Sequence, residues 1–152
     1  MKPDSARQRR RSLVTVNYLF LVVMNVCFYV VYHYRDMTHL VDVLGLSALA
    51  LVALTFYRVH AKSGLWKLTH SCTDDLDERE LQQVHTALRY AYSIFTVLCL
   101  LILLAHAVLF RLVPTVTFVI TVPLVGSLIY LAHTLPGSIL AWTESEVPGE
   151  AP

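Results

Sequence analysis

Residues Thr73–Phe110 read TDDLDERELQQVHTALRYAYSIFTVLCLLILLAHAVLF, and this stretch decides the fold. It starts with five carboxylates in seven residues and ends in an uncharged apolar run, Tyr90–Phe110. A bilayer core about 30 Å thick is crossed by roughly 20 helical residues, so this run is long enough to span a membrane. The apolar positions between the acids and the run keep helical spacing. The stretch therefore predicts one long helix that begins near Asp74 in the cytoplasm and enters the bilayer near Arg89.

Long uncharged runs recur along the rest of the chain. Of the 152 residues, 56% are hydrophobic and only 15% are charged, which is far from the balance of a soluble domain. Four runs are long enough to cross a bilayer, the second only marginally. The predicted spans cover about 12–34, 39–57, 89–110 and 113–134, joined in the middle by a loop over 58–88. The sequence thus predicts an all-α membrane protein whose domain, 12–142, is an up-down bundle of four transmembrane helices.

Lysine and arginine are divided unevenly between the two sides of the predicted bundle. The tail 1–11 and the loop 58–88, with Arg89 at its end, hold ten of these residues, whereas the other two loops hold only Arg35 and Arg111. Positively charged loops stay in the cytoplasm, which places both termini there. The acidic, Pro- and Gly-containing tail 143–152 is predicted to be disordered. Because the basic residues lie where membrane orientation requires them, the charge pattern indicates the lipid bilayer as a partner and no nucleic acid.

The acidic residues at the start of the opening stretch allow three interpretations. They are Asp74, Asp75, Asp77, Glu78 and Glu80. Carboxylates favour the first turns of a helix, where Thr73 would be the N-cap, so the simplest interpretation is a helix start. An acidic face could also dock a membrane-protein partner. A metal site formed with His85 is the third possibility, although the Glu-x-x-His pair of di-iron bundles is missing.

The loop before these acids, RVHAKSGLWKLTH, combines basic and apolar side chains. Leu65, Trp66 and Leu68 cluster among lysines, a mixture typical of segments in the lipid headgroup layer. We therefore expect this segment to lie at the membrane surface.

Polar side chains within the spans are expected to face the interior of the bundle, because lipid offers no hydrogen bonds. In the third span they form a stripe from His85 to His106. The interior polar positions predicted in the first, third and fourth spans include Asn17, Asn25, Tyr92, Thr96 and Tyr130. A proline halfway along a helix removes one backbone hydrogen bond, so Pro123 predicts a kink in the fourth span.

Histidines near the ends of the spans raise the possibility of a cofactor. Bis-histidine ligation of haem b needs two histidines on facing helices at one depth. The candidates are His33, His39, His106 and His133, with His85 as a further partner for His133. The spacing of His33, Asp36 and His39 also suits a surface zinc site if that segment is helical. No cofactor is the simpler expectation, and bound haem or quinone is the alternative.

Two short motifs carry a resemblance to a group of proteins. LDERE precedes the third span, and LPGSILAWTE closes the last one. In these motifs the chain resembles small uncharacterised integral membrane proteins of bacteria. The resemblance implies a location in the bacterial cytoplasmic membrane and no catalytic residues.

The sequence contains none of the P-loop, G-x-G-x-x-G, H-E-x-x-H and G-x-S-x-G motifs. We therefore expect a protein that is not an enzyme but an accessory, scaffold or regulatory subunit, which associates with another membrane protein or with copies of itself. The alternatives are a membrane redox protein that binds haem or quinone, and a small oligomeric transporter or channel built around the polar stripe.

Overall fold

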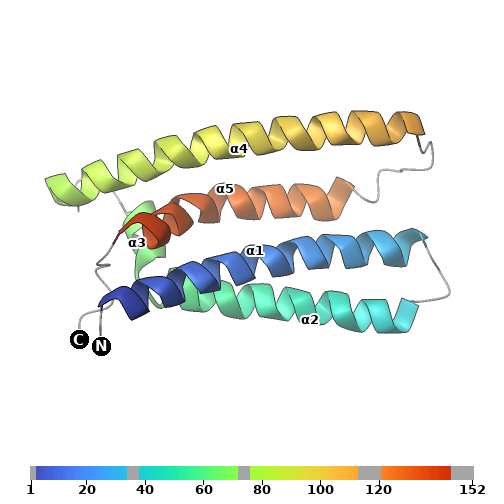
Figure 1. The fold of residues 1–152 in the computed structure, drawn as a ribbon, viewed down its shortest axis with the longest axis horizontal. Helices are drawn as coiled ribbons and strands as arrows, with labels where there is room; N and C mark the ends of the chain where they lie inside the picture. Colours follow the sequence, from blue (N-terminus) through green and yellow to red (C-terminus); the bar gives the residue numbers. More distant parts are fainter. Residues whose placement is uncertain (1–2, 34–37, 72–75, 113–120, 145–152) are drawn as a thin grey trace.

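The computed structural model describes residues 3–33, 38–71, 76–112 and 121–144, and every described element is helical. Four long helices run side by side (Figure 1), and a short helix lies near one end. In chain order the elements are α1 (Pro3–His33), α2 (Thr38–Phe56), the π-helical turn η2 (Tyr57–Ala61), α3 (Leu65–His70), α4 (Glu78–Leu112) and α5 (Thr121–Thr143). The predicted all-α architecture with four long helices is confirmed.

The long helices pack in antiparallel pairs. α1 lies against α2 and α4 lies against α5, while α1 and α5 join the two pairs. All four helices are long and apolar enough to cross a membrane, over Arg7–Val31, His39–Ala61, Glu78–Ala105 and Pro123–Thr143. The chain is therefore an integral membrane protein with four spans.

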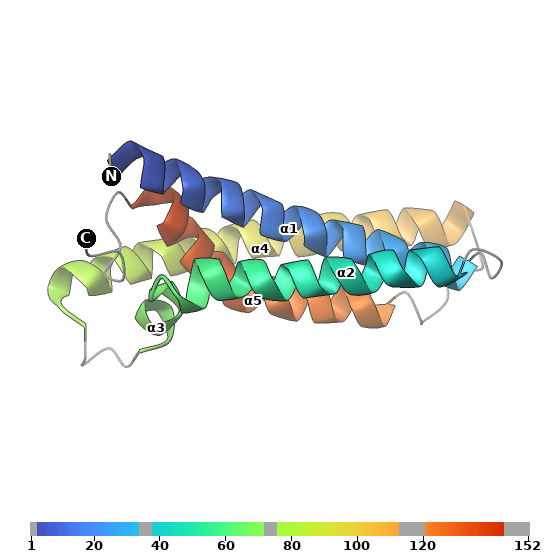
Figure 2. The same cartoon turned by 90° about the horizontal axis from the view of Figure 1, so that it is seen from below.

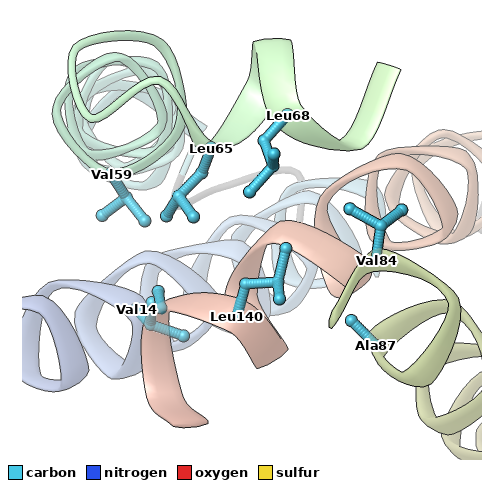
Figure 3. Packing of buried hydrophobic residues seen from close by; sticks show 8 residues of the cluster. Val14, Val59, Leu65, Leu68, Val84, Ala87 and Leu140 are labelled. Atoms are coloured by element: carbon cyan, nitrogen blue, oxygen red, sulfur yellow. The ribbon is translucent and has the colours of Figure 1, made fainter. Parts of the chain in front are cut away.

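Both ends of the described chain lie at the same end of the bundle (Figures 1 and 2). The first turns of α1 and α4, the last turns of α5, and α3 meet there, and we call this region the terminal end. One hydrophobic cluster draws on all of these elements (Figure 3). Its buried members are Val14, Val59, Leu65, Leu68, Val84, Ala87, Leu140 and Ala141. The best-buried part of the protein is thus at one end of the bundle, where five segments converge.

The connection from α2 into this cluster depends on a wide turn and a glycine. The amide of Lys62 donates to the carbonyl of Tyr57 (2.8 Å), the bond of a π-helical turn. Gly64 then has a φ of 76°, which side chains strongly disfavour, and this reverses the chain into α3. As a result Leu65 is fully buried and Leu68 is 9% exposed. Because α3 folds back against α5, both leucines pack within the protein instead of against lipid, and the expected position of this segment at the membrane surface stays a prediction.

The pairing of α1 with α2 uses small side chains on α2. Ala48 and Val52 are buried against Leu21 and Met24 of α1. Because lipid is as apolar as leucine, helices in a membrane associate through such close packing more than through burial of apolar area.

The bounds of the first and last helices differ from those predicted. α1 begins at Pro3, so most of the basic tail is helical, which suits its run of good helix formers. α5 continues to Thr143 through Pro136, whereas the predicted fourth span ended at residue 134. Pro123 is the third residue of described α5. The carbonyl four residues before it, that of Val119, lies outside the described residues, so the predicted kink stays a prediction. The first part of the predicted span, 113–120, lies outside the described residues.

Candidate functional site

The acids at the start of α4 form a helix cap. The amide of Glu80 donates to Oδ1 of Asp77 (2.6 Å), and the amide of Asp77 donates to Oε2 of Glu80 (3.3 Å). This reciprocal pair is a capping box, with the aspartate as N-cap. The helix therefore begins at Glu78, one turn later than predicted, and Glu78 itself is exposed. Asp74 and Asp75, like Thr73, lie outside the described residues.

Removing the capping box is expected to destabilise the first turn of α4. Replacing Asp77 with alanine should destabilise the first turn of α4 by about 1 kcal/mol, the usual effect of an N-cap. Amide hydrogen exchange of the first turn would report this as faster exchange. Glu78→Ala, measured in salt that screens the helix dipole, is the matched control, because its exposed carboxylate then contributes well below about 1 kcal/mol. Equal exchange in both variants would contradict the capping role.

The polar stripe of α4 faces outward. The buried face of the helix contains Val84, Ala87 and Ala91, and the stripe lies about 140° away from it around the helix. Its exposed polar members are His85, Arg89, Tyr92 and Thr96, and the exposed side chains of Glu78 and Gln82 extend the same face toward the start of the helix. Tyr92 is 75% exposed, so the predicted interior position is wrong for Tyr92 and for Thr96. The reason is that α4 makes its main contacts on one side only, with α5 and, at its start, with α3.

A second polar group lies between α1, α2 and α5. Asn17, which is 1% exposed, donates to the Val52 carbonyl (3.1 Å) and to the Thr55 hydroxyl (2.8 Å). The hydroxyl of Tyr130 donates to Oδ1 of Asn17 (2.9 Å). Asn25 donates to the Ser127 hydroxyl (2.7 Å). Thus Asn25 and Tyr130 both make bonds between helices, and Asn17 joins three helices.

Arginines of α1 hold the end of α5. Three of them donate to backbone carbonyls that the helix leaves free at its C-terminus. Their positive charge also interacts favourably with the negative end of the helix dipole. Arg10 is only 4% exposed, and the guanidinium of Arg11 lies 5.1 Å from the centre of the Trp142 ring. The bonds join Arg7 to Thr143 (3.1 Å), Arg10 to Glu144 (2.9 Å) and Arg11 to Trp142 (2.9 Å). The basic residues used to predict orientation therefore also tie the two ends of the chain together.

The candidate histidines are spread over the fold. His33 lies at the end of α1, His39 is exposed near the start of α2, and His106 lies in the second half of α4. His133 is exposed on α5, and the ring that faces it is that of His70 on α3, with centroids 6.3 Å apart. His70 is not among the histidines predicted as ligands, because a histidine in a basic loop gives no sign of a distant partner.

The remaining metal hypotheses concern groups of three or more ligands. Within the described ranges, no three His, Cys, Asp or Glu side chains are placed to hold one ion. The zinc site predicted for His33, Asp36 and His39 includes a residue outside those ranges, as does the site of Asp74, Glu78 and His85.

Searches for related proteins returned no match: no family model, no curated protein and no solved structure resembles the chain closely enough to be assigned. The function of the chain is therefore inferred from the geometry of its own residues.

Proposed function

We propose that this protein is a non-catalytic accessory subunit of a membrane assembly, and that the outward polar stripe of α4 is its docking surface. The observation that carries the proposal is the exposure of this stripe. A polar side chain that faces lipid is left without hydrogen-bonding partners, whereas a neighbouring protein supplies them. The stripe is thus suited to contact with another protein helix.

Individual side chains of the stripe differ in what they need from a partner. The hydroxyl of Thr96 donates to the carbonyl of Tyr92 (2.8 Å) and is satisfied within the helix. The exposed side chains of His85, Arg89 and Tyr92 extend away from the buried face and remain available. Tyr92 lies beyond Arg89, the predicted entry into the bilayer, where an interhelical hydrogen bond contributes about 0.6–2 kcal/mol. His85 and Arg89 lie at or before that point and add orientation to the contact.

The acidic start of α4 belongs to the same surface, but only one of its described acids contributes to it. Asp77 and Glu80 are occupied by the cap, so Glu78 is the described acid at the start of α4 whose exposed carboxylate is not part of the cap. One exposed acid followed by a histidine and an arginine on the same face favours a partner with mixed polar groups over a strongly basic one.

We further propose that the terminal end lies in the cytoplasm and that the membrane is the bacterial cytoplasmic membrane. The excess of lysine and arginine at the terminal end supports the orientation. The resemblance of LDERE and LPGSILAWTE to bacterial membrane proteins supports the location. The redox and transport hypotheses stay predictions.

Two tyrosines on α4 provide a matched test of docking. Tyr92 lies on the stripe and is 75% exposed, while Tyr90 is 59% exposed and lies on another side of the helix. Tyr92→Leu combined with Arg89→Gln is expected to weaken association with the partner at least tenfold, while Tyr90→Leu leaves it unchanged. Association would be measured by co-purification after gentle extraction, with a photo-crosslinker at position 92 or 90 to identify the neighbour.

The crosslinked product distinguishes the possible partners. A different protein at position 92 supports an accessory subunit, and a second copy of this chain supports a homo-oligomer instead. Equal crosslinking from positions 92 and 90, or equal loss of association in both leucine variants, would rule out the stripe as the docking surface.

A further inference from the structure

We propose that the partner on the polar stripe of α4 is a transmembrane helix that presents an aspartate or glutamate carboxylate to Arg89. The proposal rests on the docking function above and adds the chemistry of the partner. It depends on three features of Arg89: its isolation as a charge along α4, the lack of an anion for it among the described residues, and the direction in which it faces.

Arg89 is an isolated charge in a long apolar part of α4. Between Glu80 and Arg111 the sequence contains no other Asp, Glu, Lys or Arg. The residue lies within the candidate span Glu78–Ala105, whose most apolar stretch is only 11% buried inside the protein, against 44% for that of α5. An arginine stays charged in such surroundings and is costly to leave there alone, so a nearby anion stabilises it.

The described parts of the chain do not supply this anion. The backbone carbonyl of Arg89 accepts from the Ser93 hydroxyl (3.0 Å), whereas its guanidinium makes no hydrogen bond or ion pair with a described residue. The nearest described carboxylate on the same face of α4 is that of Glu78, about 16 Å away along the helix. By contrast, Arg7 and Arg11 of α1 donate to carbonyls at the end of α5. The anion for Arg89 therefore comes from outside the described residues.

The direction of Arg89 favours a protein helix over a lipid headgroup. The stripe that contains it lies about 140° around α4 from the buried face, so α5 does not cover it. Tyr92, one turn further into the predicted span on the same face, is 75% exposed. A lipid phosphate that reached Arg89 would leave the Tyr92 hydroxyl facing lipid, whereas a helix along α4 contacts both side chains. A carboxylate on that helix also matches the planar guanidinium, which binds it through two parallel hydrogen bonds.

The test separates Arg89 from the rest of the stripe, using the full chain extracted gently from its own membranes. Arg89→Gln alone, with Tyr92 intact, is expected to weaken co-purification of the partner at least tenfold. Arg89→Glu should weaken it further, because two carboxylates would then meet, and Arg89→Lys should retain most of it. Arg79→Gln is the matched control. It removes the same charge from an exposed arginine about 110° around α4 from the stripe and should leave association unchanged.

A photo-crosslinker at position 92 then identifies the segment of the partner that faces Arg89. Mass spectrometry of the crosslinked peptide is expected to find a membrane-spanning helix with an aspartate or glutamate within about two helical turns of the crosslink. Replacing that acid by lysine should abolish association with the wild-type chain and restore it with Arg89→Glu. Because Arg89 is exposed, its variants are expected to fold, and circular dichroism would verify that each keeps its helical content.

The outcomes distinguish this inference from the docking function. If position 92 crosslinks to a protein and position 90 does not, but Arg89→Gln associates as the wild type does, the docking surface holds and the acidic partner is ruled out. A crosslinked helix without an acid in reach has the same meaning. Equal crosslinking from both positions would overturn the docking function and this inference together. Crosslinking of position 92 to lipid alone would do the same, and Arg89 would then bind a headgroup phosphate.

Discussion

Replacement of Leu65 by alanine is expected to lower the free energy of unfolding by about 2–5 kcal/mol, the range found for buried leucines. Leu65 is fully buried in the cluster of the terminal end, between α3 and the neighbouring helices (Figure 3). Alanine would leave a cavity where five segments converge, and α3 would lose its main anchor. Equilibrium unfolding in mixed micelles, followed by circular dichroism, measures the loss.

A second leucine, Leu101, serves as the control that separates the loss of packing within the protein from the loss of an apolar side chain. Leu101, on the outward side of α4, is 59% exposed, so lipid surrounds it in the membrane. Because lipid tails are as apolar as leucine, Leu101→Ala removes little packing within the protein. We expect its effect to remain below about 1 kcal/mol, the usual range for substitutions away from a packed core. Comparable losses in the two variants would show that α3 does not pack as the structure has it.

The four spans could be predicted from the sequence because the bilayer imposes a strong and local requirement. A helix that crosses lipid must be about 20 residues long and almost free of charge, and both properties are visible in a single run of residues. These features depend only on neighbours in the sequence.

The direction of the polar stripe could not be predicted in the same way. The rule that polar side chains face the interior assumes that other helices surround each span. α4 instead packs along one side, so Tyr92 and Thr96 face away from the bundle although their spacing is as regular as expected. Whether a helix lies at the centre or the edge of a bundle depends on contacts between distant segments, which no local pattern contains.

The structure of short segments also could not be predicted from the sequence. α3 has six residues, too few for a helical period to separate a buried face from a surface one, and its lysine and tryptophan are typical of both. The start of α4 has several possible caps, and only the backbone turn at Asp77 selects one. The stacking of the His70 and His133 rings likewise depends on α3 folding back against α5. The turn at Gly64 permits this fold but does not specify it.

The second large effect is expected at Asn17. Its side chain makes three hydrogen bonds, to Val52, Thr55 and Tyr130, and joins three helices within the membrane. Asn17→Leu preserves the approximate volume but removes all three bonds. At about 0.6–1.7 kcal/mol per bond, the expected loss in the free energy of unfolding is about 2–5 kcal/mol. Equilibrium unfolding in micelles measures it.

Asn25→Leu is the matched control for this substitution. Asn25 donates to Ser127 on α5 and to the carbonyl of Leu21 on its own helix, so only one of its bonds joins two helices. We therefore expect a loss of about 1 kcal/mol from Asn25→Leu, well below that of Asn17→Leu. If the two asparagine variants were equally stable, the bonds of Asn17 would not be what joins α1, α2 and α5.

A double-mutant cycle with Tyr130→Phe isolates one of the three bonds. Tyr130→Phe alone removes the donor to Asn17, at an expected cost of about 1 kcal/mol. In the Asn17→Leu background that hydroxyl has already lost its acceptor, so removing it should cost nothing or even stabilise the protein. If the two side chains act as a pair, we expect a coupling energy of about 1 kcal/mol. Additive effects would mean that Asn17 is held by Val52 and Thr55 alone, and that α5 is joined to α1 by packing, by the arginines at its end and by other hydrogen bonds such as that from Asn25 to Ser127.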